Sequence, residues 1–163
     1  MKYQIRQNVF SIRSRFIIKD EHEQPRYTVE GKFFSLGKQL TLYNMQGVEE
    51  IYIEQKIFRF LPEYHFYKKR QHIATIKKEI SFLRPRYYIE SNQGHYEIEG
   101  NVFAYDFKII KNKKMIAIVN KRWFSFGDTY GVEISDCEDV SFILALVIVL
   151  DQIHHEDQKN HSS

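Results

Sequence analysis

Apolar and polar residues alternate in short runs along most of this chain. The clearest runs are residues 26–30, 39–43, 50–54 and 95–99. A period of two over four to eight residues is typical of strands with one buried face. Polar segments at residues 20–25, 44–47, 91–94 and 111–114 separate such runs, and each is long enough to close a hairpin. The pattern predicts a mainly β protein.

The C-terminal part of the chain has a different pattern. Residues 142–150 are all apolar, and Ser135 and Glu138 have the spacing of a capping box. The pattern predicts a helix from Asp136 to about His154, with Ser135 as its N-cap. A helix that is apolar on every side must be buried on every side, and this run is shorter than the roughly 20 residues that span a bilayer. We therefore expect the helix to lie inside a β-barrel, followed by a polar, disordered tail over residues 156–163.

Four segments repeat a weak motif of a polar residue, an apolar residue, phenylalanine and a small residue. The phenylalanines are Phe10, Phe34, Phe103 and Phe124. The first and last pairs have similar spacings, which suggests pseudo-symmetry in a closed sheet. Since phenylalanine is most often buried, we expect these four side chains to pack in the core.

Composition is consistent with one domain, which we place at residues 1–155. Aromatic residues make up 15% of the 163 residues, and they favour strands. Cys137 is the single cysteine, which excludes an internal disulfide. We expect it to be a small buried residue rather than a nucleophile. The first residues lack the apolar core of a signal peptide, so a cytoplasmic location is expected, with peripheral contact to a membrane as a further option.

Two segments carry a resemblance to a known family. Residues 29–37, with the sequence VEGKFFSLG, and residues 128–134, with the sequence DTYGVEI before the apolar helix, resemble the LURP-one-related (LOR) family of the Tubby C-terminal-like superfamily. The similarity is closest to small members from bacilli. It implies a closed β-barrel of about twelve strands around a buried hydrophobic C-terminal helix. Relatives by fold include tubby proteins, which bind phosphoinositides, and phospholipid scramblases, but their lipid-binding residues match no motif here.

A basic stretch is the most suggestive candidate site. Aromatic residues are interleaved with its cations, so the stretch suits an anionic ligand such as phospholipid head groups. Nucleic acid is an alternative, because exposed aromatics stack on bases. A protein-interaction role and a merely solvated strand face also remain open. The candidate ligand-binding residues are Arg59, Lys68, Lys69, Arg70, Lys77, Lys78, Arg84 and Arg86.

Signals for catalysis are weak. The seven glycines form no phosphate-binding loop, and no Gly-x-Ser-x-Gly or His-Glu-x-x-His motif occurs. We therefore expect a non-enzymatic binding module with no catalytic residues, no metal site and no cofactor.

Overall fold

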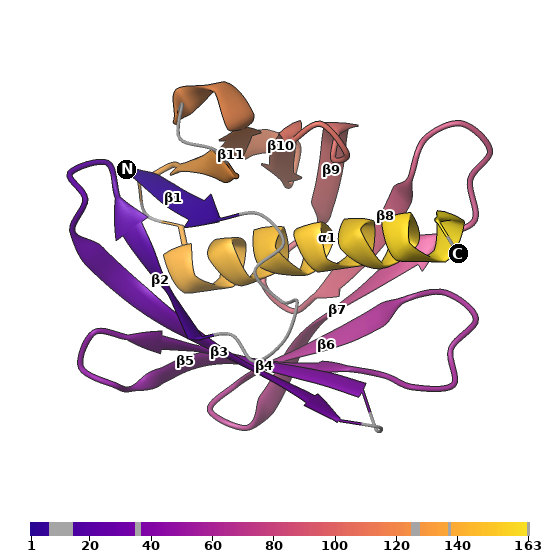
Figure 1. Ribbon diagram of the computed structural model, residues 1–163, viewed down its shortest axis with the longest axis horizontal. Coiled ribbons are helices and arrows are strands. Elements are labelled where there is room, and N and C mark those ends of the chain that lie inside the picture. The colour runs from indigo at the N-terminus through magenta and orange to yellow at the C-terminus, as the bar shows by residue number, and fades with distance from the viewer. Residues whose placement is uncertain (7–14, 35–36, 125–127, 137, 163) are drawn as a thin grey trace.

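Twelve strands and one long helix make up this chain (Figure 1). The computed structural model describes residues 1–6, 15–34, 37–124, 128–136 and 138–162. The strands are β1 Lys2–Arg6, β2 Arg15–Asp20, β3 Pro25–Phe34, β4 Gly37–Asn44, β5 Glu49–Gln55, β6 Glu63–Lys68, β7 Gln71–Glu79, β8 Arg86–Ser91, β9 Tyr96–Asn101, β10 Asp106–Lys111, β11 Lys114–Asn120 and β12 Thr129–Ile134. A short 3₁₀ helix, η1 Lys121–Trp123, follows β11, and α1 Val140–His161 ends the fold.

The strands form one antiparallel sheet that curls into a nearly closed barrel. Their order is β8-β7-β6-β5-β4-β3-β2-β1-β12-β11-β10-β9. Three of the four predicted hairpin turns join paired strands, at residues 20–25, 44–47 and 111–114. The fourth, at residues 91–94, instead links β8 to β9, the two edges of the sheet. In the described part of the chain no ladder joins these edges, so the barrel has a seam where the sequence predicted full closure.

Strand alternation places the apolar side chains inside the barrel. Leu40 and Leu42 of β4 and Ile51 and Ile53 of β5 are each at most 2% exposed. The turn between these strands is stabilised by Asn44, whose Oδ1 accepts hydrogen bonds from the backbone amides of residues 46 and 48. This side chain replaces ladder partners that the backbone lacks in the turn.

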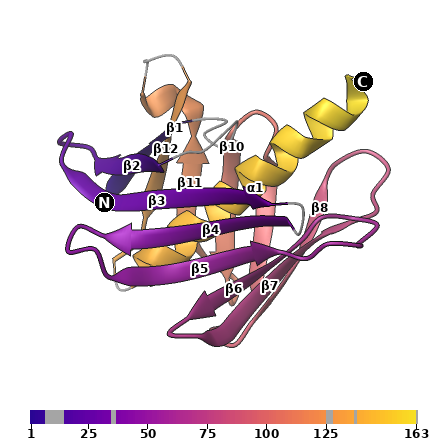
Figure 2. The same ribbon diagram turned by 60° about the horizontal axis from the view of Figure 1, so that its bottom comes forward.

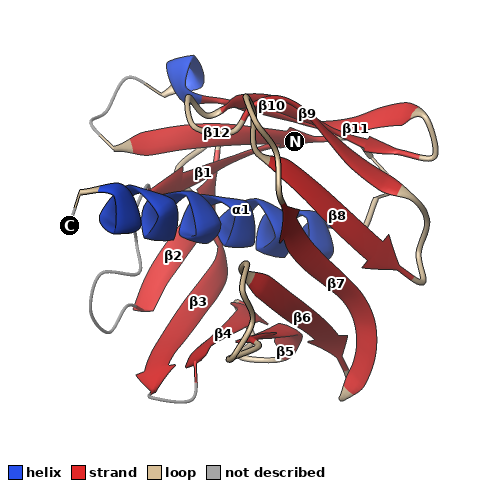
Figure 3. Cartoon of the chain, turned by 90° about the vertical axis from the view of Figure 1, so that its right-hand side faces the viewer, coloured by secondary structure: helices blue, strands red, loops and turns tan. Residues whose placement is uncertain are grey.

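The helix α1 runs through the barrel and forms the centre of its core (Figure 2). All residues from Ser141 to His154 are buried. Strands surround the helix on several sides in Figure 3. Because the helix is apolar around its whole circumference, the barrel interior is the one environment that removes all of that surface from water. The predicted fold class is therefore confirmed.

The predicted N-cap of this helix was wrong. The helix begins at Val140, and Asp139 is the N-cap, with its Oδ1 accepting from the amide of Phe142 at 3.2 Å. The amide of Ser135 instead bonds to the carbonyl of Ile116, next to the β11–β12 ladder. Sequence spacing alone matched a capping box, but the chain still follows the sheet at residue 135.

The predicted disordered tail is corrected for residues 156–161, which continue the helix. Glu156 forms an ion pair with Lys38 and Asp157 forms one with Lys78. The barrel wall therefore supplies partners for the acidic side chains of this part of the helix.

The repeated phenylalanines do not form a common core set. Phe103 is 44% exposed, which contradicts the prediction for this residue, and Phe124 is only half-buried. The preceding Val102 takes the buried position, at 3% exposed. Phe10, the side chain of Phe34 and Cys137 lie outside the described residues.

Candidate functional site

The basic stretch is divided between the two ends of the barrel. Lys68, Lys69 and Arg70 lie at the β6–β7 turn, where Lys68 Nζ is 2.8 Å from Asp139 Oδ2 at the start of α1. The other five candidates lie where α1 ends, because β7 runs from that turn to the far end and Lys78 pairs there with Asp157. These five are Arg59, Lys77, Lys78, Arg84 and Arg86. One continuous strand stretch thus supplies two separate cationic groups.

Several of these cations are balanced by one carboxylate. Glu63 is 8% exposed and lies 3.5 Å from Arg59 Nε and 3.6 Å from Lys77 Nζ. Its Oε2 also contacts His65 Nε2 at 2.8 Å. Burial alone would raise the pKa of Glu63, but the His65 contact and the two cations outweigh burial and lower it. The field of Arg59 and Lys77 is therefore partly offset.

Two adjacent loops at the same end expose a group of large apolar side chains. We call this group the apolar tip; its members are each at least 80% exposed and are Phe58, Phe60, Ile80, Phe82 and Leu83. The loops lie between β5 and β6 and between β7 and β8, and the amide of Lys78 donates to the carbonyl of Pro62 at their base. Figure 1 shows both loops beside the C-terminal end of α1. Soluble domains rarely expose apolar groups of this size together without a partner.

The aromatics of the basic stretch are divided between core and surface. Tyr64 and Phe66 are completely buried against the helix side of the sheet. Tyr87 is half-buried, whereas Tyr88 is 47% exposed. Tyr64 and Phe66 are therefore unavailable to stack on a ligand, whereas Tyr88 and Phe82 of the apolar tip are exposed.

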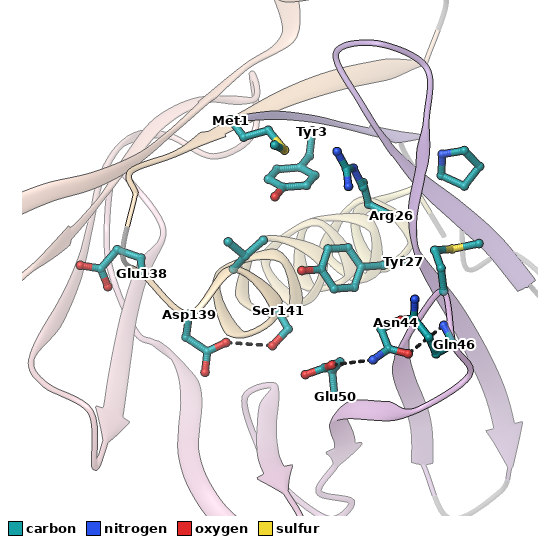
Figure 4. Close-up of a pocket in the computed structure, with 13 residues that line it drawn as sticks. Met1, Tyr3, Arg26, Tyr27, Asn44, Gln46, Glu50, Glu138, Asp139 and Ser141 are labelled. Atoms are coloured by element: carbon teal, nitrogen blue, oxygen red, sulfur yellow. Dashed lines mark hydrogen bonds between the residues drawn. The ribbon is translucent and has the colours of Figure 1, made fainter.

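The opposite end of the barrel contains a pocket of about 520 Å³ beside the start of α1 (Figure 4). We call it the barrel-end pocket. Tyr3, Tyr27 and Glu50 line it from the sheet, and Asp139 and Ser141 line it from the helix. It forms because α1 begins inside the barrel and leaves the mouth unfilled. Behind the pocket, the buried residues of α1 fill the barrel.

A model of the LOR (LURP-one-related) family matches residues 1–151. The chain belongs to the LOR family. This LOR chain is also similar to the uncharacterised protein YxjI of Bacillus subtilis, with 32% identity over 154 residues and 94% of each chain covered. The family resemblance found in the sequence is confirmed.

A solved structure supports the fold of this LOR chain. An X-ray structure of an Arabidopsis thaliana protein superposes with a TM-score of 0.65, covering 93% of this chain and 91% of that one. The identity is 14%, so the likeness concerns the fold alone.

Sequence reasoning missed most of the apolar tip, although a signal exists. Each loop contains an aromatic–arginine element that ends in proline, FRFLP at residues 58–62 and FLRP at residues 82–85. Proline removes a ladder donor, so an apolar run that ends in proline favours a loop over a central strand. Phe58, Phe60, Ile80 and Leu83 could have been assigned to exposed loops on this ground.

Two other kinds of site have no counterpart in the described residues. Over the described ranges, no three His, Cys, Asp or Glu side chains gather closely enough to hold a metal ion. Within the same ranges, no helix has both the length and the apolar character needed to cross a membrane.

Proposed function

We propose that this LOR chain is a non-enzymatic binding module that associates peripherally with membranes containing anionic phospholipids. The observation that carries the proposal is the apolar tip, which stands beside unneutralised arginines at one end of the barrel. The apolar side chains would enter the boundary between head groups and acyl chains. The arginines would remain at the level of the phosphates.

The apolar tip supplies a favourable free energy of insertion. Its five side chains are at least 80% exposed in the folded chain, so they gain nearly their whole transfer free energy when they leave water. Full burial of one large apolar side chain is worth about 1.5–3 kcal/mol. Partial insertion of several such residues is enough to offset the entropy lost on binding to a surface.

The neighbouring cations supply the preference for anionic lipid. Arg84 and Arg86 border the β7–β8 loop, and neither forms an ion pair within the part of the chain that the structure describes. Each Lys or Arg near an anionic surface contributes about 1 kcal/mol. Arg59 and Lys77 add less, since Glu63 lies beside both.

The three cations of the β6–β7 turn contribute little to this contact. About eight strand residues separate Lys69 from Lys77, which corresponds to about 26 Å at the rise of a β-strand. The Debye length at physiological ionic strength is about 8 Å. A membrane that contacts the apolar tip is therefore screened from Lys69 and Arg70, so these residues provide a matched control.

The apolar tip also favours a second candidate function, a protein-interaction module. A protein partner with an apolar groove would bury the same side chains. Nucleic-acid binding has less support, because Tyr64 and Phe66 are completely buried and cannot stack on bases.

Co-sedimentation with liposomes tests the proposal. Wild-type protein is mixed with neutral vesicles and with vesicles containing an anionic phospholipid, at low and near-physiological salt. Binding is expected to be stronger to anionic vesicles, and to fall with salt. The variant Phe58→Ser/Phe82→Ser should lose most binding to both.

Charge variants identify the surface that binds. Arg84→Glu/Arg86→Glu should remove the preference for anionic vesicles, whereas Lys69→Glu/Arg70→Glu, with the same change in charge at the other end, should keep it. If wild type binds no vesicle at any salt concentration, the lipid proposal is wrong and a protein partner becomes the better candidate. Equal loss in both charge variants would contradict the assigned surface.

A further inference from the structure

We infer that the barrel-end pocket binds a small organic cation, such as an alkylammonium or alkylguanidinium group. Glu50 would provide the counter-charge, and the hydroxyls of Tyr3 and Tyr27 would provide polar contacts. This site lies at the opposite end of the barrel from the apolar tip. It is therefore independent of membrane association and stays accessible during it.

An unpartnered phenol points to a ligand in this pocket. Tyr3 is 5% exposed, and Figure 4 shows its hydroxyl directed into the hollow. Among the residues that the structure describes, no group forms a hydrogen bond with this hydroxyl. The hydroxyl reaches the open space of the pocket, so a polar group bound there would supply a hydrogen-bond partner for it.

The charges around the pocket leave one carboxylate without a cation. Glu138 pairs with Lys111 at 2.9 Å, and Asp139 pairs with Lys68 at 2.8 Å. Glu50 accepts from the neutral Nδ2 of Asn44 at 3.0 Å and forms no ion pair in the described ranges. The Glu50 charge is therefore free to attract a ligand of opposite sign.

The two cationic groups that line the pocket already have partners. Arg26 Nε lies 2.7 Å from Asp20 Oδ2. The N-terminal ammonium of Met1 donates to the carbonyl of Ile134 at 3.2 Å, and Met1 lies across the pocket from Glu50 in Figure 4. An anionic ligand would compete with Asp20 for the arginine, whereas a cation would meet Glu50 directly.

The ionisation of Tyr27 is consistent with a negative field in the pocket. Burial, with further contributions from Tyr3, Glu50 and Asp139, raises the pKa of Tyr27 to about 12. The opposing effect of Arg26 is smaller than that of either carboxylate. Burial is the largest cause of this rise, but the Glu50 and Asp139 charges that add to it would also attract a cation. The rings of Tyr3 and Tyr27, with centroids 6.2 Å apart, add two aromatic faces suited to cation–π contact.

The helix N-terminus does not make this an anion site. Asp139 Oδ1 already accepts from the amide of Phe142 and from the Ser141 hydroxyl. The N-cap carboxylate thus occupies the position that a bound anion would take at a free helix end. The geometry therefore favours a cation.

Titration by ¹H–¹⁵N NMR tests the inference on the full chain. The probe is n-butylammonium, with 1-butanol as the neutral isostere and butyrate as the anion of similar size. Saturable shifts of the Glu50 and Ser141 amides are expected with n-butylammonium alone. Glu50→Gln should weaken the affinity by about fivefold, the scale of one partly exposed ion pair.

Two further variants keep the outcome decisive. Glu90→Gln removes an exposed carboxylate on β8 and should leave the affinity unchanged. Tyr27→Phe keeps the ring but removes its hydroxyl, and should weaken binding even if Glu50→Gln disturbs folding. The inference is overturned if n-butylammonium causes no saturable shift, if butyrate binds equally well, or if folded Glu50→Gln and Tyr27→Phe both bind like wild type. Vesicle binding is proposed for the other end of the barrel. The outcome of this titration therefore neither supports nor contradicts the membrane proposal.

Discussion

The hydroxyl of Tyr64 donates a 2.8 Å hydrogen bond to Oε1 of Glu156. This contact joins β6 of the barrel wall to the last turns of α1, 92 residues later in the chain. Glu156 also forms an ion pair with Lys38 of β4. The polar end of the helix is thus attached to the barrel by specific contacts, whereas its middle is held by apolar packing.

Removing Glu156 should destabilise the fold more than removing the Tyr64 hydroxyl. Glu156→Ala leaves the hydroxyl of the completely buried Tyr64 without its acceptor, a loss of about 1–3 kcal/mol. Tyr64→Phe leaves Glu156 paired with Lys38 and should cost about 1 kcal/mol. Urea unfolding measures both, with Glu90→Ala as an exposed control. The reverse order would contradict the view that a buried Tyr64 hydroxyl without its acceptor is the larger loss.

Asp139 should make the fold sensitive to acid. Burial raises the pKa of this carboxyl, but Lys68, Ser141 and the Phe142 amide outweigh burial and lower it. A lowered pKa means that the carboxylate stabilises the fold above its unfolded-state pKa of about 3.9. That contribution is lost as the pH falls through the lower folded-state value.

The variant Asp139→Asn separates the charge from the cap, since asparagine is also a good N-cap. It should be less stable than wild type at neutral pH, and the difference should shrink as the pH falls below about 4. Denaturant midpoints measured between pH 7 and 2.5 check this, with the exposed Asp106→Asn as control. Parallel profiles for wild type and Asp139→Asn would contradict the assigned role.

Any side chain at position 131 should destabilise the fold. A Cβ at this position would lie 2.8 Å from Cε2 of Phe124 and 2.9 Å from Cε3 of Trp123. Because two rings must move, Gly131→Ala should destabilise the fold by about 1–3 kcal/mol. Thermal unfolding measures the change, and Gly47→Ala provides a comparison in which the new methyl group meets no neighbour but the backbone has a positive φ of 79°. A neutral Gly131→Ala would mean that η1 shifts freely.

Truncation of a leucine should lower stability when the leucine lies in α1, and should lower vesicle binding when it lies in the apolar tip. Leu146 is fully buried, so Leu146→Ala should cost about 2–5 kcal/mol of stability. Leu83 is 94% exposed, so Leu83→Ala should leave stability within about 0.5 kcal/mol of wild type. The same Leu83→Ala should reduce sedimentation with anionic vesicles. A large loss of stability in Leu83→Ala would mean that this side chain serves the fold instead of a surface contact.

The local patterns of the chain determined its class and its core element. Alternation in segments such as 39–43 and 50–54 predicted strands correctly, because one side of each strand must be apolar to face the core. The uninterrupted run at residues 142–150 predicted a buried helix, because only an enclosed position removes every face from water. The resemblance at residues 29–37 and 128–134 added the number of strands.

Tertiary structure alone decided where the helix begins, how far it extends and which surfaces are available. Ser135 satisfied a local capping pattern, but the neighbouring strand β11 binds its amide, and Asp139 caps the helix instead. Residues 156–161 are polar, yet they remain helical where Lys38, Tyr64 and Lys78 of the barrel wall meet their side chains.

Tertiary structure also decided which candidate site residues lie together. Eight cations that are near one another in sequence lie at two ends of the barrel, because β7 spans its whole height. The barrel-end pocket joins residues of β1, β3, β5 and the start of α1, which no local pattern places together. Sequence patterns specify which face of each segment is buried, but the contacts between distant segments arise only when the sheet closes around the helix.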